Sequence, residues 1–482
     1  MRQISVRKTS RYIEKTMALE NKIIIKKSGL YLIGNFSSKI LASLLLPIYA
    51  VYVTAAELGT YDMIYTVCSM IIPVVFFCMW EATLRYVLKA EEEEKKKYTS
   101  TLLGFLFIDV LLILFGAILG KNVLQLTYKF YYESVAYIVV FGCAQVLQAL
   151  TRAIKKNGIY VISGIASTAV NFLCVLLFVC FFKKGTAGLL WAAIFGQTSV
   201  IVITVLSVHV WKYFDFKLFD QKLLVKMLVF SIPLVLNQAV SWLISSFSKV
   251  VINIHIGVVS NGQYSFAGKF SVLVTMVGSV VSMALFEEAV LASGNVEFGE
   301  KYGKAVNNLN RLFFTVITVA FPAICVFYYL FASTDYMPSK FLVPILLVYA
   351  ILMNFATNLG SVFQVIDKTK YQFTTTMIGA IVSCGLSYIL VFRFSIYGVV
   401  IGQLLGAMAM LLSRYLFVEK YIHLSIDFRE FIIMAFIFAI VSIICARTSV
   451  TLNLIIFVLL SSIAIYWNRA MINSLYNRIL KK

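Results

Sequence analysis

The chain has 482 residues, of which 61% are hydrophobic and only 13% are charged, and its formal net charge is +20. Soluble domains contain about 45–50% apolar and about 25% charged residues, so this composition excludes a soluble enzyme. The 39 phenylalanines and 27 tyrosines also exclude a disordered chain, which is poor in aromatic residues.

The apolar residues gather in runs of membrane-spanning length. A spanning helix needs about 20 mostly apolar residues, and in lipid such a run must be helical because every backbone polar group needs an internal partner. The sequence therefore predicts about fourteen transmembrane helices. In chain order they are 29–52, 60–82, 100–119, 132–151, 158–181, 187–210, 227–248, 263–286, 310–332, 341–364, 372–392, 396–418, 430–446 and 449–467.

The basic residues alternate between the gaps that separate these runs. Lysine and arginine are about four times as frequent in the N-terminal tail and every second gap after it as in the intervening gaps. This is the pattern of the positive-inside rule, so it predicts an even number of spans with both termini in the cytoplasm. The same pattern explains the net charge without a nucleic-acid partner.

The sequence lacks the spacings of metal, haem and nucleotide sites. It has no CxxC pair and no P-loop, and its histidines, His209, His255 and His423, are far apart. We therefore expect no metal and no cofactor. We also expect that the protein is not an enzyme and does not itself hydrolyse ATP.

A short motif occurs twice, at two predicted junctions between a loop and a helix. Gly59 directly precedes the second run and Tyr61 lies at its start, and Gly262 and Tyr264 stand in the same way at the eighth run, 203 residues later. Glycine there is expected to allow a tight chain reversal, and tyrosine to lie at the membrane interface.

Glycine pairs suggest the same duplication at the other end of each repeat. Two pairs with eight-residue spacing are offset by 210 residues, Gly188 with Gly196 and Gly398 with Gly406. Together with the first motif they predict an all-α polytopic protein with two six-helix lobes, related by a pseudo-two-fold axis along the membrane normal, and two further C-terminal helices. The expected segments are a basic cytoplasmic tail (1–28), an N-lobe (29–210), a cytoplasmic linker (211–226), a C-lobe (227–418), and the last two helices with a basic tail (419–482).

Ionisable residues within the runs are candidates for function because a charge at membrane depth needs a partner or water. Lys39 lies about 15 Å into the first run, near the midplane, beside Asn35. Lys269 lies six residues into the eighth run. Asp109, in the middle of the third run, is the best acidic candidate for coupling to protons or cations, or else the counter-ion of a lysine.

Two further groups lie at the ends of runs. Glu81 and Arg85 have the favourable i,i+4 order and are expected to form a pair. In the seventh run Asn237 starts a polar stripe at i+4 spacing that ends in Lys249, which must face another helix or a wet cavity. The candidates carry net positive charge, which suits an anionic substrate because lysine and arginine bind phosphate oxygens.

Short segments spread along the chain form a recognisable set. They are Asn35–Lys39, Leu44–Tyr49, Ala56–Asp62, Pro73, Glu81–Tyr86, Ser231–Pro233, Asn237, Trp242, Gly262–Lys269 and Asp367–Lys370. Together they resemble Wzx-type polysaccharide flippases of the multidrug/oligosaccharidyl-lipid/polysaccharide exporter superfamily, and the resemblance is specific over residues 35–86 and looser afterwards. The chain departs from the family at Ser248-Lys249, where an Asp-Arg pair is usual, and around Ser383 and Ser387, where asparagines are common.

The resemblance implies a flippase in the bacterial inner membrane that moves polyprenyl-diphosphate-linked oligosaccharides to the outer leaflet for capsule, O-antigen or exopolysaccharide synthesis. It would work by alternating access, driven by an H⁺ or Na⁺ gradient or by the membrane potential. Lys39, Arg85 and Lys269 would hold the diphosphate or acidic sugars in a V-shaped cavity. The expected partners are this substrate, membrane lipids, and a polysaccharide polymerase with its chain-length proteins.

Three alternatives remain open from the sequence. A cation-coupled drug exporter would need an acidic cavity, and a membrane glycosyltransferase or polymerase would normally need a larger extramembrane loop. A peptidoglycan-precursor flippase of the same superfamily fits the same residues.

Overall fold

A computed structural model describes residues 41, 44–123, 125, 128–291, 298–366 and 368–467. All regular structure in this part of the chain is helical, and ten of its helices are long and apolar enough to cross a membrane. The prediction of an all-α polytopic membrane protein is therefore confirmed. Each predicted run from 60–82 onward lies on helix, and the described end of the first run contains a short helix, α2 (Leu45–Tyr52).

The chain forms two compact units, and two helices contribute to both. The first unit contains Ile64–Trp242, and the second contains Leu46–Met63 and the chain from Leu243 onward. The boundaries therefore fall within α3 (Ala55–Val75) and α9 (Gln221–His255).

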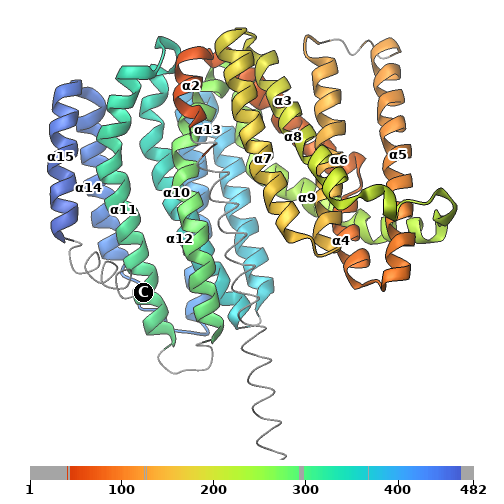
Figure 1. Ribbon diagram of the computed structural model, residues 1–482. Coiled ribbons are helices and arrows are strands. Elements are labelled where there is room, and N and C mark those ends of the chain that lie inside the picture. Colours follow the sequence, from red (N-terminus) through yellow and green to blue (C-terminus); the bar gives the residue numbers. More distant parts are fainter. Residues whose placement is uncertain are drawn as a thin grey trace, which may run out of the picture. The chain divides into compact units, whose positions relative to one another are not determined.

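The helices of each unit follow the predicted runs closely (Figure 1). In the first unit they are α4 (Met79–Lys89), α5 (Glu92–Asn122), α6 (Tyr131–Ala153), α7 (Asn157–Val175) with a π-helical end (Leu176–Phe181), α8 (Gly185–Val208), and the short 3-10 helices η2 (Val210–Tyr213) and η3 (Phe216–Leu218). In the second unit they are α10 (Val258–Leu291), α11 (Phe298–Phe331), the 3-10 helix η4 (Thr334–Phe341), α12 (Val343–Val365), α13 (Thr369–Glu419), α14 (Phe428–Arg447) and α15 (Val450–Trp467).

The second predicted run, 60–82, is not one continuous helix. α3 ends at Val75 and α4 begins at Met79, and between them Phe77 and Cys78 both have a φ of 49°. Proline removes a backbone donor and crowds the preceding turn, so Pro73 weakens the helix just before the break. The Cys78 N–H donates instead to the Pro73 carbonyl, at 3.1 Å.

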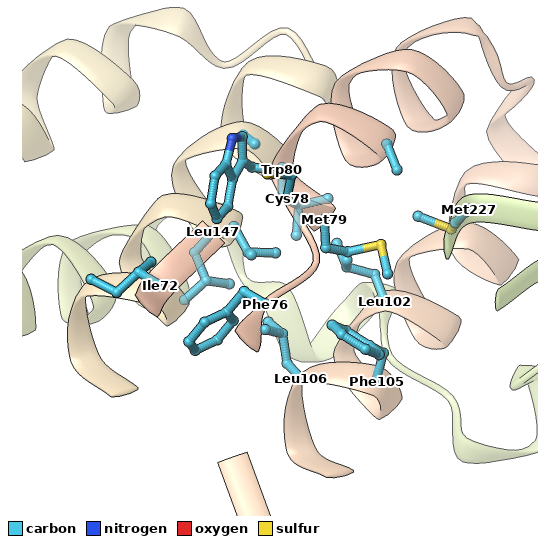
Figure 2. Close-up of a cluster of buried hydrophobic side chains, with 14 of the residues drawn as sticks. Ile72, Phe76, Cys78, Met79, Trp80, Leu102, Phe105, Leu106, Leu147 and Met227 are labelled. Atoms are coloured by element: carbon cyan, nitrogen blue, oxygen red, sulfur yellow. The ribbon is translucent and has the colours of Figure 1, made fainter. Parts of the chain in front are cut away.

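The break is packed into the core of the first unit. Phe76, Cys78 and Met79 are fully buried there, among side chains of α5, α6 and α9 (Figure 2). The ring of Phe76 lies on Gly142 of α6 so closely that a Cβ at Gly142 would come within 2.0 Å of it. The interruption is therefore held by tertiary packing, which the apolar pattern of 60–82 does not reveal.

The second unit has its own core, built on α11, α12 and α13. α14 and α15 pack against α11 (Figure 1), and buried aromatic residues such as Phe355 and Phe363 fill the space between α12 and its neighbours. Ser395, with a φ of 52°, divides α13 into the two helices predicted as 372–392 and 396–418.

The spaced glycine pairs serve close helix packing in both units. A Cβ at Gly196 of α8 would lie 2.9 Å from the Ser167 carbonyl of α7. A Cβ at Gly406 would lie 2.4 Å from the Ser383 side chain, across the two halves of α13. These glycines therefore allow neighbouring helices to approach closely.

Candidate functional site

A network of polar side chains centres on Asp62 in the second unit. Lys249 Nζ of α9 donates to Asp62 Oδ1 at 2.9 Å, and Ser265 Oγ of α10 donates to Asp62 Oδ2 at 2.7 Å. The side chains of Lys249 and Asp62 are 26% and 17% exposed. One carboxylate thus links three helices, and we call Asp62, Lys249 and Ser265 the Asp62 network.

The repeated Gly-x-Tyr motif brings this network together. Gly59 of α3 and Gly262 of α10 face each other, since a Cβ at Gly59 would lie 2.7 Å from the Gly262 nitrogen. Asn261 Nδ2 donates to the Gly59 carbonyl at 3.0 Å. The role expected for these glycines is wrong: both lie within helices and permit close helix contact, not a chain reversal.

Lys269 lies one helical turn beyond Ser265. Its ammonium is 4.7 Å from the centre of the Tyr49 ring, and no ion pair to it occurs among the described residues. A cation over an aromatic face is stabilised by about 0.5–2 kcal/mol. With Asp62 engaged by Lys249, Lys269 has no acidic partner of its own among the described residues.

A second group of cations lies in the first unit, on an aromatic platform. The Arg85 guanidinium of α4 is 4.3 Å from the centre of the Phe230 ring, and Lys226 Nζ of α9 is 5.3 Å from that of Tyr86. Tyr86 stacks on Tyr98 of α5, with 6.0 Å between ring centres. We call these five residues the Arg85–Lys226 cluster.

Both cations of this cluster are exposed, and neither forms an ion pair within the described part of the chain. Glu81, expected to pair with Arg85, is also exposed, and no ion pair joins the two in the part of the chain that the structure describes. Guanidinium and ammonium groups bind phosphate oxygens, and aromatic rings pack against the apolar faces of sugars. The cluster therefore has the chemistry to bind a phosphorylated sugar.

Asp109 is a buried acid of α5 in the first unit. Its side chain is 4% exposed, and its Oδ2 has no hydrogen-bond partner. Among the described residues no lysine lies close enough to serve as its counter-ion. Burying an unpaired carboxylate is costly, which makes Asp109 an unusual residue of this core.

The polar stripe of α9 divides between the two units. Asn237 has an exposed side chain in the first unit, and Lys249 joins the Asp62 network in the second. Between them, Trp242 Nε1 donates to the Thr66 carbonyl at 2.8 Å and anchors α9 to α3. Lys39 and Asn35 lie outside the described residues.

Sequence reasoning missed two groups at these sites. Asp62 and Ser265 occupy equivalent positions of the repeated motif. If the two copies of the motif had been expected to touch at Gly59 and Gly262, the contact between Asp62 and Ser265 would have followed. Lys226 immediately precedes the run 227–248, at the end of the segment 211–226 that the sequence predicts as a cytoplasmic linker. A second missed cation, Arg414, is 5% exposed and donates to Thr375, Thr376 and the Ala356 carbonyl, which makes it a structural element of the second unit.

Comparison with known proteins identifies the family. The sequence profile of the family described as polysaccharide biosynthesis protein matches residues 24–286, which is more than half of the chain. Among curated proteins no significant match is found.

Solved structures show how widely the fold is shared. The lipid II flippase MurJ, in an inward closed conformation, aligns with a TM-score of 0.68 and 16% identity over 91% of this chain and 99% of its own. An inward-facing multidrug resistance MATE transporter of the MOP superfamily aligns with a TM-score of 0.61 and 17% identity over 81% of this chain and 97% of its own. A mutant of the MATE transporter VcmN of Vibrio cholerae aligns with a TM-score of 0.54 and 15% identity over 82% of this chain and 95% of its own.

At these identities the structures establish the fold, and the sequence profile establishes the family. The resemblance found in the sequence is confirmed at both levels. This chain belongs to the polysaccharide biosynthesis protein family and has the membrane-transporter fold of MurJ and the MATE proteins.

Proposed function

We propose that the protein is a flippase that moves polyprenyl-diphosphate-linked oligosaccharides across the bacterial inner membrane for polysaccharide synthesis. The observation that carries this proposal is the Arg85–Lys226 cluster. Its two cations lack acidic partners in the described structure and lie on aromatic rings, as a diphosphate joined to sugars requires. The membrane fold and the family of polysaccharide biosynthesis proteins support the same assignment.

Arg85 and Lys226 would bind the diphosphate, while Tyr86 and Phe230 would pack against the sugars. Lys39, Asn35, Asn237 and Lys269 remain proposed contributors along the path. The polyprenyl tail needs no polar site because it can remain in lipid.

Lys249 has a conditional role in this proposal. Its charge is already neutralised by Asp62, so an anion reaching it must displace the carboxylate or find it protonated. We therefore assign Lys249 to a step in which the Asp62 network opens, and not to the first capture of substrate.

Asp109 is the proposed coupling residue. Its buried and unpartnered carboxyl can accept a proton from one side of the membrane and release it when its surroundings change. Proton coupling is preferred to Na⁺ coupling here, because a sodium site would need several oxygen ligands around the carboxylate. The lobe boundaries, the cytoplasmic termini, the reliance on a gradient or the membrane potential, and the polymerase and chain-length partners all remain part of the proposal.

Two alternatives of the same fold are distinguishable by cargo. A cation-coupled drug exporter fits less well, because unpaired arginine and lysine side chains repel a cationic drug. A peptidoglycan-precursor flippase would use the same diphosphate chemistry. A membrane glycosyltransferase or polymerase would need catalytic groups outside the spans.

Transport into proteoliposomes tests the proposal. We expect purified protein to move a fluorescent lipid-linked oligosaccharide between leaflets, and Arg85→Gln or Lys226→Gln to lower that rate at least about tenfold. Lys222→Gln is the matched control, because Lys222 is exposed on α9 one turn before Lys226 and contacts no ring of the cluster. Unchanged transport in both cluster variants, or transport of a cationic drug alone, would contradict the proposal.

A further inference from the structure

The segment between α8 and α9 joins two helices that are long and apolar enough to cross a membrane. α8 ends at Val208 and α9 begins at Gln221. The intervening twelve residues, 209–220, connect the ends of these two helices. From here on the name linker means residues 209–220, in place of the predicted bounds 211–226, and this segment lies beside the N-terminal end of α5 (Figure 1).

The inner side of the linker is fastened to α5. Ser100 Oγ donates to the Tyr213 carbonyl at 3.1 Å and accepts from the Asp215 N–H at 2.9 Å. Phe219 packs on Gly104 so closely that a Cβ there would lie 2.6 Å from its ring.

The end of the linker is held by charge as well. Lys97 Nζ forms an ion pair with Asp220 Oδ2 at 2.6 Å, and the Asp220 N–H donates to Thr101 Oγ1 at 3.2 Å. These contacts fix which side of the linker faces the protein, so the opposite side is presented outward.

The outer side combines large rings with unpaired lysines. Trp211 and Phe216 are 52% and 74% exposed, and Phe214 is 40% exposed. Lys212 and Lys217 are exposed, and within the described residues neither forms an ion pair. We call these five residues the linker face.

The acids of the linker offset only part of this charge. Asp220 is engaged by Lys97, and the Asp215 carboxylate, which accepts the backbone N–H of Lys217, balances one of the two lysines. The linker face therefore keeps a net positive charge beside aromatic rings, a combination favoured at membrane interfaces.

We propose that the linker face is a docking surface for anionic phospholipid headgroups. The rings enter the interfacial region, while Lys212 and Lys217 contact lipid phosphates. Charge complementarity and the position of the linker between two helices able to cross a membrane favour this occupant over a soluble partner. Lipid binding at this face does not depend on the cargo that the protein carries.

Lipid-specific quenching of Trp211 tests the proposal in full-length protein in nanodiscs. Subtracting the emission of Trp211→Phe isolates this residue from the other four of the 5 tryptophans. A small fraction of brominated phosphatidylglycerol should quench Trp211 more strongly than the same fraction of brominated phosphatidylcholine. The preference should weaken with salt.

The lysines should set that preference. Each lysine near an anionic surface contributes about a fivefold preference, so Lys212→Gln with Lys217→Gln should remove most of it. The matched control is Lys183→Gln with Lys184→Gln, because these exposed lysines also adjoin exposed aromatic residues, at the other end of α8. Equal quenching by the two lipids, or no quenching, would overturn the proposal. No quenching by either lipid would indicate that the linker face lies in water or against another protein.

Discussion

Replacing Gly262 with alanine should strain the contact between α3 and α10. The added Cβ would lie 1.8 Å from the Ala55 carbonyl oxygen and 2.7 Å from its carbon, and backbone atoms cannot rotate away as a side chain can. Overpacking of this kind costs about 1–3 kcal/mol. Separating the helices would also weaken the bond from Asn261 to Gly59, at about 0.5–1.5 kcal/mol.

The matched control is Gly268→Ala, six residues further along α10. A Cβ at Gly268 meets nothing within 4 Å, and alanine is favoured over glycine in a helix by about 1 kcal/mol. The two substitutions should therefore act in opposite directions. The apparent melting temperature in detergent should fall by several degrees for Gly262→Ala and stay level or rise for Gly268→Ala. A melting temperature of Gly262→Ala equal to that of its control would refute the assignment of this contact.

Three further predictions concern charged groups. Asp62→Asn should leave Lys249 without its anion, which should lower the melting temperature and alter transport at saturating substrate. If the variant matches wild type in both assays, the Asp62 network has no part in the mechanism. Asp109→Asn should fold normally but lose the stimulation of transport by a pH gradient, and stimulation equal to wild type would exclude it as the coupling residue. The hydrogen bond from Lys97 holds the pKa of Asp220 below its usual range. The pair therefore stabilises the folded linker at pH values above the unfolded-state pKa of Asp220, about 3.9, and this stabilisation is lost as the pH falls through the lower pKa of the folded state. Protease cleavage of the linker should therefore be faster in Lys97→Met than in wild type at neutral pH, and the difference should vanish in strong acid.

The fold was largely predictable because hydropathy reports span length directly. Even the short neighbouring runs 430–446 and 449–467 match α14 and α15. The break at residues 76–78 was not predictable in the same way. The apolar character continues through it, and its positive φ angles depend on packing against Gly142.

The candidate sites were only partly predictable, because they depend on which helices meet. Arg85 stood out as a charge at the end of a run, but the aromatic platform beneath it comes partly from α9, far along the chain. Lys249 appeared to be a free cation, because its partner Asp62 is 187 residues away. A charge count along the sequence therefore overstated the cations available to a substrate.

The most direct measurement is the affinity of purified protein for a short-chain polyprenyl-diphosphate sugar, compared with its monophosphate analogue. Wild type should prefer the diphosphate. Arg85→Gln and Lys226→Gln should each weaken diphosphate binding about tenfold and erase most of that preference, while Lys222→Gln retains it. Equal affinity of wild type and both cluster variants for the diphosphate would contradict recognition of the headgroup by these cations.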